Sequence, residues 1–599
     1  MSRKRKYGIL RGMSQLSARS IPYGIADFKR IRNEGYYYVD KTEYLAKMEV
    51  RDSFVFFVRP RRFGKSLFLD MLRCYYDRSE EANFEKLFGG LWIGDHPTPN
   101  RNRYLTLKLD FSQAGATGGR SLQDCFEAYL GERFLSFIAA YPEVYDDEFR
   151  RGAAAKPTLE RFISMTDVAK AKGAPIYLII DEYDNFTNAL IRSAGSEPYK
   201  SITHGTGFYR EWFKKFKGNV DRIFMTGVSP VTMDDLTSGF NIAANISQDA
   251  AFNSMLGFSE AETLRIYRDF MGVGEFREGD PEAVVRSIKP WYDGYCFAKA
   301  RIGKESVYNS DMVLYHLKSM VAEGVPPEDM VDPNIATDYD KLETIVDLQR
   351  AAGAQDAEDV SPLTEELAAT GEIAFDLVAS FPADEIIKPE NFRSLFHYYG
   401  ILSMAERRKG MSYFRVPNAC VEKQLFNYLR DSYRRTRLPD WIGWSKLASA
   451  MAYRGDWEPF FRRLAADFAE TTPVRGGLSG EIRLQGYMQA EFGHIRFYMA
   501  RPEMELARGY CDFCLFPERV YYGDAKHSYI VELKHSKADA PDAELAAKAA
   551  DGIAKLRQYA ADPFVPDLAK GTTLHLILFQ FKGFDLYRLE EIPLVIHNP

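Results

Sequence analysis

The chain of 599 residues is too long for a single hydrophobic core, so we expect about three or four domains. Its 46% hydrophobic and 14% aromatic content is ample for globular folding. The net charge of -6 excludes binding of nucleic acid through overall basic character, so any such contact must depend on local patches. The six scattered cysteines indicate a reducing compartment, and no segment has the pattern of a signal peptide or membrane span. We expect a soluble, cytoplasmic protein without a membrane partner.

The pattern of apolar and polar residues changes several times along the chain. Residues 1–20 are basic and predict a flexible tail. Residues 21–250 alternate apolar strands with helices, which predicts a parallel sheet with helices on both faces. Residues 251–330 are mostly helical, and residues 331–440 are mixed, with a helix and a short β unit typical of a winged-helix-like module. Residues 441–599 predict a second α/β domain, so the fold class is α/β with several domains.

The stretch FVFFVRPRRFGKSLFLDML, residues 54–72, predicts a buried strand, a tight loop and the start of a helix. Gly64, Lys65 and Ser66 supply close backbone N–H groups, a long cation and a hydroxyl for Mg²⁺, beside the helix N-terminus. Arg59 stands where the usual first glycine of a P-loop would be, and a chance Gly-Lys-Ser sequence is the alternative. We expect a P-loop NTPase fold that binds ATP and Mg²⁺. The candidate nucleotide-binding residues of the loop are Arg59, Arg61, Arg62, Phe63, Gly64, Lys65, Ser66 and Leu67.

Two later strands also end in polar residues. The apolar run 176–180 is followed by Asp181 and Glu182. In a P-loop ATPase an acidic residue at the end of the neighbouring strand holds Mg²⁺, and a following glutamate orients or deprotonates the attacking water. We assign these roles to Asp181 and Glu182. A third strand ends near Thr226 and Ser229, which are candidates for sensing the γ-phosphate. An ordinary strand end with a hydroxyl is the alternative.

The last domain has a second set of charged residues on predicted strands. Asp512 lies in the strand 509–516, and Glu532 and Lys534 lie in the strand that follows. Because Glu532 and Lys534 are two apart, they project from the same face. On adjacent strands Asp512 and Glu532 can share a Mg²⁺, while Lys534 polarises water or stabilises phosphate charge. This is the chemistry of phosphodiester hydrolysis, and a charged edge strand is the alternative.

Several strings in this sequence resemble one family. The strings are YVDKT at 38–42, RPRRFGKSL at 59–67, IIDEYD at 179–184, MTGVSP at 225–230 and WYDGY at 291–295. They resemble the AAA-ATPase-like family of bacterial proteins, many of which carry a C-terminal nuclease-like domain of the PD-(D/E)XK superfamily. The family shares an arginine at the position of Arg59, which argues against a defective loop. The resemblance implies that residues 251–330 form a helical lid over the nucleotide. It also implies that Asp40 or Lys41 lies near the nucleotide, with capping of a helix as the alternative.

The resemblance adds expectations for the C-terminal domain. The pattern D…E-x-K of this superfamily matches Asp512, Glu532 and Lys534. The superfamily often has a further acidic metal ligand on a preceding helix, and Glu481 is in the matching place. It often has a glutamine on the following helix, where this sequence has Gly552, with Gln558 further along.

Together these observations predict an ATPase that gates a Mg²⁺-dependent nuclease. We expect nucleic acid, with DNA favoured over RNA, as the partner of the C-terminal domain. The rival hypothesis is a nucleotide-controlled switch or scaffold that binds a partner and keeps an inactive nuclease fold. Whether the loop arginines act within one chain or reach a neighbouring subunit stays open, and so does a homo-oligomer.

Overall fold

The chain divides into two compact units, residues 1–338 with 374–419, and residues 339–373 with 420–599. The computed structural model describes residues 20–114, 120–184, 208–230, 244–277, 279–334, 367, 371–382, 385, 388–425, 441–471, 484, 485, 487, 488, 491, 492, 495, 497–506, 509–517 and 522–594. Within these residues, no helix combines the length and the apolar character that crossing a membrane requires.

The first unit is built on a five-stranded sheet in which all neighbouring strands run parallel. The strand order β2-β3-β4-β1-β5 comprises β1 (Phe54–Val58), β2 (Leu105–Asp110), β3 (Ile176–Asp181), β4 (Arg222–Gly227) and β5 (Ala244–Asn245). The parallel sheet expected from the alternating pattern is confirmed. One expectation is wrong: the acidic strand β3 is not the neighbour of β1, because β4 lies between them. Which strand lies beside which is set by tertiary packing, and the local sequence carries no mark of it.

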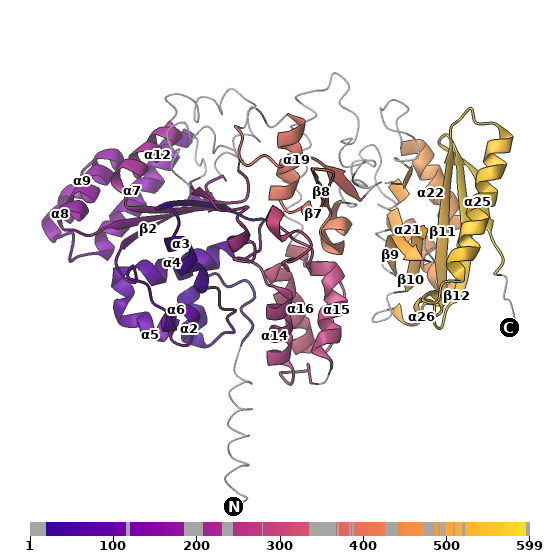
Figure 1. Ribbon diagram of the computed structural model, residues 1–599, viewed down its shortest axis with the longest axis horizontal. Coiled ribbons are helices and arrows are strands. Elements are labelled where there is room, and N and C mark those ends of the chain that lie inside the picture. The colour runs from indigo at the N-terminus through magenta and orange to yellow at the C-terminus, as the bar shows by residue number, and fades with distance from the viewer. Residues whose placement is uncertain are drawn as a thin grey trace, which may run out of the picture. The chain divides into compact units, whose positions relative to one another are not determined.

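Helices cover both faces of this sheet, as expected (Figure 1). One face carries α7 (Leu122–Ala140), α9 (Thr158–Ala171) and α12 (Phe208–Asn219), with α8 (Asp147–Ala154) beside them. The other carries α4 (Lys65–Tyr76) with the shorter α2 (Phe28–Glu34), α3 (Glu43–Glu49), α5 (Phe84–Phe88) and α6 (Trp92–Asp95). The buried side chains are largely aliphatic and aromatic, so the sheet is a rigid platform for the loops at its carboxyl edge.

The segment before β1 has a structural role. Residues 36–40 form no strand, and α3 begins only at Glu43. The Asp40 carboxylate accepts hydrogen bonds from the backbone N–H groups of Thr42 at 2.9 Å and Trp92 at 2.6 Å. Lys41 donates to Glu262 at 2.7 Å. These contacts support the capping alternative for this motif rather than a nucleotide contact.

The helical region after the sheet contains α14 (Glu260–Phe270), α15 (Pro281–Tyr292) and α16 (Ser310–Glu323). Helix α14 begins with a reciprocal capping box between Ser259 and Glu262. At and just after the end of α15, Tyr292 and Tyr295 of the WYDGY string are buried in the protein interior. Further along, α19 (Pro389–Tyr398) is followed by the hairpin of β7 (Ser403–Arg408) and β8 (Met411–Arg415), as expected, and β6 (Glu372–Ala374) pairs beside β8.

The second unit has a mixed five-stranded sheet in the order β13-β12-β11-β10-β9. Its strands are β9 (Tyr498–Leu506), β10 (Gly509–Pro517), β11 (His527–Ser536), β12 (Thr573–Lys582) and β13 (Asp585–Glu591). The long helix α25 (Asp542–Ala560) packs on one face, with α26 (Val565–Leu568) after it. On the other face lie α21 (Trp441–Arg454) and α22 (Glu458–Thr471) (Figure 1). The predicted α/β domain is therefore present, with β11 at the centre of its sheet.

Candidate functional site

The loop between β1 and α4 has the backbone shape of a phosphate-binding turn. Arg62 and Gly64 have positive φ angles of 65° and 91°, and α4 begins directly after Gly64. Alternating backbone signs of this kind turn successive N–H groups toward one point, next to the positive end of the helix dipole. Leu67 is half-buried in the first turn of α4. The local backbone therefore matches the predicted nucleotide loop.

Lys65 and Ser66 are the first two residues of α4, directly after the loop. The Lys65 ammonium donates hydrogen bonds to the loop carbonyls of Arg59 at 3.0 Å and Pro60 at 2.9 Å, so it lies under the loop. The Ser66 hydroxyl donates to the Asp181 carboxylate at 2.9 Å. This contact joins the loop after β1 to the end of β3, across the intervening strand β4. The two predicted Mg²⁺ ligands of the first unit are therefore brought together, although their strands are not neighbours.

The acidic end of β3 is buried and conformationally unusual. Asp181 is 4% exposed, and burial raises the pKa of its carboxyl, while Ser66 and the charge of Lys65 lower it. Glu182 has a positive φ of 51°, a conformation that non-glycine residues adopt at a cost of order 1 kcal/mol or more. Such strain is typical of functional sites. These residues fit a Mg²⁺-bound nucleotide, since a buried carboxylate and a hydroxyl are ligands that Mg²⁺ prefers.

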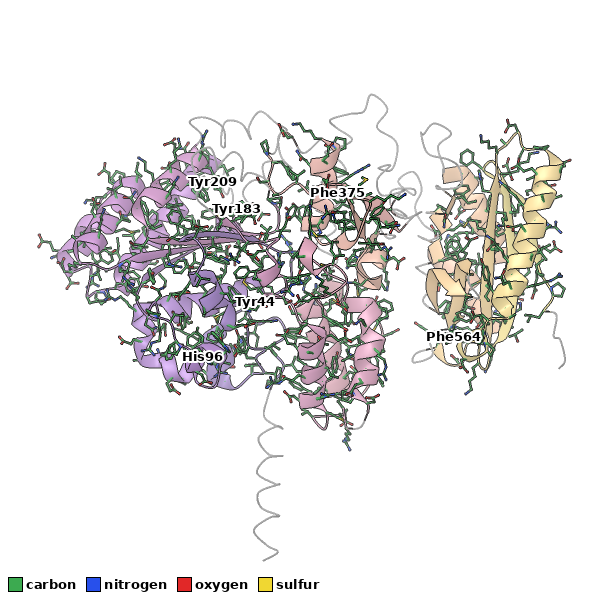
Figure 2. All side chains as sticks on the ribbon, viewed as in Figure 1. Tyr44, His96, Tyr183, Tyr209, Phe375 and Phe564 are labelled. Atoms are coloured by element: carbon green, nitrogen blue, oxygen red, sulfur yellow. The ribbon has the colours of Figure 1, made fainter. Side chains whose placement is uncertain are left out.

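The predicted sensor residues have different surroundings. The Thr226 hydroxyl donates to the Phe57 carbonyl at 2.6 Å, inside the sheet, which supports the strand-end alternative for Thr226. Ser229 is buried, and its N–H donates to the Asp184 carboxylate at 2.9 Å. Sequence reasoning missed this role of Asp184, which holds the loop after β4. Tyr209, beside Tyr183 in Figure 2, donates to the Tyr183 carbonyl at 2.6 Å and so supports the segment after β3.

Two of the three loop arginines can be placed by their contacts, and Arg59 departs from the prediction. Its guanidinium is 2% exposed and donates to the carbonyls of Val58 at 2.9 Å, Ser247 at 2.7 Å and Phe252 at 2.9 Å. These contacts support a structural role in place of the expected phosphate contact. Arg62 pairs with Asp311 of α16 at 2.8 Å.

The remaining predicted residues of the loop pack or line it. Phe63 is buried and packs edge-on against Tyr295 and Phe297, at centroid distances of 4.9 and 5.6 Å. Its contribution to the site is therefore to anchor the loop on the helical region. Arg61 is half-buried within the loop.

The second unit places its predicted acidic residues on adjacent strands. In the antiparallel register of β10 and β11, Phe513 pairs with Val531, so Asp512 stands next to Glu532 on one face. The Asp512 carboxylate accepts a hydrogen bond from the Leu533 N–H at 2.7 Å. Burial, and then the charge of Glu532, raise the pKa of Asp512 to about 7. The position predicted for a further metal ligand, Glu481, lies outside the described residues.

Glu532 is a buried carboxylate with one unsatisfied oxygen. It is 1% exposed, and both ion pairs that reach it involve Oε1, from Lys534 at 2.9 Å and Lys555 at 3.1 Å. Oε2 has no hydrogen-bond partner among the described residues. The attraction of Glu532 and Asp551 raises the pKa of Lys534 despite burial, so Lys534 is a firmly charged group here.

This arrangement fits a divalent cation. A buried oxygen without a partner and a neighbouring carboxyl that retains its proton are both costly, and a bound cation would offset both costs. Within the described part of the chain, no three or more His, Cys, Asp or Glu side chains converge on one point. The donor set therefore suits Mg²⁺, which binds through one or two carboxylates and keeps several of its waters.

Helix α25 contributes residues that the sequence reasoning missed. Lys534 pairs with Asp551 at 2.8 Å, and Lys555 approaches Glu532 from the same helix. Asp551 and Lys555 are four residues apart in the sequence, and this spacing indicates that they share one face of the helix. The glutamine expected on this helix has no counterpart at Gly552. A Cβ at this position would lie 2.7 Å from Leu578 and 3.1 Å from Lys534, so a larger side chain would need its neighbours to shift.

The raised pKa of Asp512 predicts a pH-dependent response to Mg²⁺. Between pH 3.8 and about 7 the folded protein holds a proton that the unfolded chain releases, so without metal its stability falls as pH rises across this window. Mg²⁺ must displace this proton, so its affinity should be about tenfold weaker at pH 6 than at pH 8. Thermal unfolding with a Mg²⁺ titration at both pH values measures this. Asp512→Asn should remove the difference, and an equal Mg²⁺ response at both pH values in the unmodified protein would contradict the assignment.

Comparisons with known proteins match the two regions of the chain that contain these residues. Residues 22–237 match a family model described as a predicted AAA-ATPase, and residues 480–591 match one of the PD-(D/E)XK nuclease superfamily. A relative from Azotobacter chroococcum mcd 1, named "Uncharacterized protein in vnfD 5'region", is 28% identical over 306 residues. The match covers 51% of this chain and 53% of the relative, so the chain spans about half the length of that curated protein. The chain thus has one region that matches the model of a predicted AAA-ATPase family and a C-terminal region that matches a model of the PD-(D/E)XK nuclease superfamily.

Proposed function

We propose that this protein hydrolyses ATP and uses the reaction to control Mg²⁺-dependent cleavage of nucleic acid, with DNA favoured over RNA. One observation supports the proposal: each unit has two neighbouring oxygen-bearing side chains beside a lysine, and we assign these side chains as Mg²⁺ ligands. In the first unit these ligands are Ser66 and Asp181, and in the second they are Asp512 and Glu532. A metal ion and a cationic side chain near the phosphate can promote hydrolysis of both a phosphoanhydride and a phosphodiester.

In the first unit, the residues act on the nucleotide by position and charge. Lys65 lies at the loop and would exchange its two carbonyl contacts for phosphate oxygens. Ser66 and Asp181 would hold Mg²⁺, which would supply positive charge against the charge of the phosphates. Glu182, next along the chain, would hold the attacking water and accept its proton. Arg62 would pair either with Asp311 or with the phosphates. Because Asp311 belongs to α16, this exchange would link the loop to that helix.

In the second unit, Asp512 and Glu532 would hold Mg²⁺, which would supply Lewis acidity for attack of water on the phosphodiester. Lys534 lies 2.9 Å from Glu532 and is held by Asp551, so its ammonium is fixed in direction. It would stabilise the negative charge that develops on the phosphate. The control of this step by ATP is inferred from the presence of both regions in one chain.

ATP turnover is expected to depend on Lys65 and Glu182 in different ways. Lys65→Ala should abolish nucleotide binding, because it removes the cation at the phosphates. Glu182→Gln should bind a fluorescent ATP analogue as the unmodified protein does, but lose about 100-fold or more in turnover. Phosphate release assays and analogue titrations measure the two effects. Lys47→Ala, which removes a lysine paired with Glu43 on the surface, is the control and should change neither. Full turnover in both site variants would refute the ATPase proposal.

Cleavage is expected to depend on Glu532. Plasmid and single-stranded DNA incubated with protein, Mg²⁺ and ATP should be cut, and Glu532→Gln should reduce cutting by about 100-fold or more, since it removes a metal ligand. Glu544→Gln is the control, because Glu544 pairs with Lys548 on the same unit's α25 and should be silent. Intact ATP turnover without any cutting of DNA or RNA would favour the rival hypothesis of a nucleotide-controlled switch with an inactive nuclease fold.

A further inference from the structure

Two lysines from different elements reach the same oxygen of Glu532, and the proposed cleavage needs only one of them. Lys534 belongs to β11, while Lys555 belongs to α25. We propose that Lys555 is a phosphate-binding subsite for the backbone of a nucleic-acid strand. This inference rests on the proposed nuclease function and deepens it, because it assigns the side from which the substrate backbone is held.

The two lysines differ in exposure and in the number of their partners. The Lys534 side chain is 13% exposed and is fixed between Glu532 at 2.9 Å and Asp551 at 2.8 Å. The Lys555 side chain is 42% exposed, with Glu532 at 3.1 Å and Asp551 at 4.0 Å. Lys534 is therefore the buried, oriented cation, and Lys555 is the one that solvent and a large ligand can reach.

The position of Lys555 is set by close packing of α25 on the sheet. At Gly552 a Cβ would lie 2.7 Å from a methyl carbon of Leu578 and 3.1 Å from the Lys534 side chain, so this helix face lies directly against β11 and β12. Residues three apart on a helix share a face, which directs position 555 toward the same strands. Lys555 is thus held beside the carboxylates by the packing of its helix, not only by its ion pair.

Electrostatic repulsion and attraction indicate how the Lys555 ammonium would respond to a bound metal ion. A divalent cation on Asp512 and Glu532 would repel the ammonium of Lys555 and compete with it for Glu532. The flexible four-carbon stem of lysine lets the ammonium move while its helix stays in place. A phosphodiester anion next to the carboxylates would then be its natural partner, and the exposed side of the site is where such a chain can lie.

The test measures binding rather than cleavage. A fluorescein-labelled DNA duplex is titrated with the full-length protein in Ca²⁺, and the anisotropy is followed at several salt concentrations. A lysine that contacts one phosphate contributes about 0.9 to the slope of log K against log salt. Lys555→Gln and Lys555→Ala should each lower this slope by about that amount, and Lys555→Arg should retain it. Arg557→Ala removes an exposed cation from a different face of α25 and should leave the slope unchanged.

The outcomes separate the inference from the function on which it rests. If the unmodified protein binds the duplex and both neutral variants keep its full slope while melting normally, Lys555 is a structural ion-pair partner and the inference is wrong. In that case the proposed nuclease function stands. If the unmodified protein neither binds the duplex nor cuts nucleic acid, the proposed function fails and takes the inference with it. A smaller slope of log K against log salt in Lys555→Gln and Lys555→Ala, with the slope of Arg557→Ala unchanged, supports the proposed phosphate-binding subsite.

Discussion

A buried carboxylate must be stabilised by a cation or by hydrogen-bond donors, and both units of this protein are arranged around that constraint. Asp181 is 4% exposed and Glu532 is 1% exposed. Asp181 is stabilised by the Ser66 hydroxyl and the charge of Lys65, and Glu532 by two lysines. The arrangement is incomplete for Glu532, which keeps an oxygen with no hydrogen-bond partner in the described part of the chain.

Cationic side chains also stabilise the fold, and their surroundings distinguish this structural role from the role of the lysines beside the buried carboxylates. Arg59 lies between the rings of Phe57 and Phe297, at 4.2 and 4.1 Å from their centroids, and donates to backbone carbonyls. It therefore fastens the end of β1 to the segments after β5. This arrangement explains how a loop that lacks its usual first glycine keeps its shape: the guanidinium supports the turn from within, and Gly64 and Arg62 supply the left-handed residues.

The sequence was sufficient for much of the architecture because buried strands leave a clear signature. The apolar runs that form β1, β3 and β4 are typical of buried strands. The two-residue spacing of Glu532 and Lys534 indicated that both side chains lie on the same face of their strand. Strand order was not predictable, since β4 enters between β1 and β3 without any local signal. The role of Arg59 was not predictable either, because its partners Ser247 and Phe297 are far away in the chain. The sequence did not indicate that Lys555 lies beside Glu532, because this position results from the packing of α25 on the sheet.

The central claim is that one chain holds two separate Mg²⁺ sites, and counting bound metal tests it most directly. Mn²⁺ titrated into the full-length protein, with and without a non-hydrolysable ATP analogue, reports the sites by calorimetry or electron paramagnetic resonance. The account predicts one site without nucleotide, lost in Asp512→Asn, and a second that needs nucleotide, lost in Asp181→Asn. A single class of site, or unchanged metal binding in both variants, would contradict it.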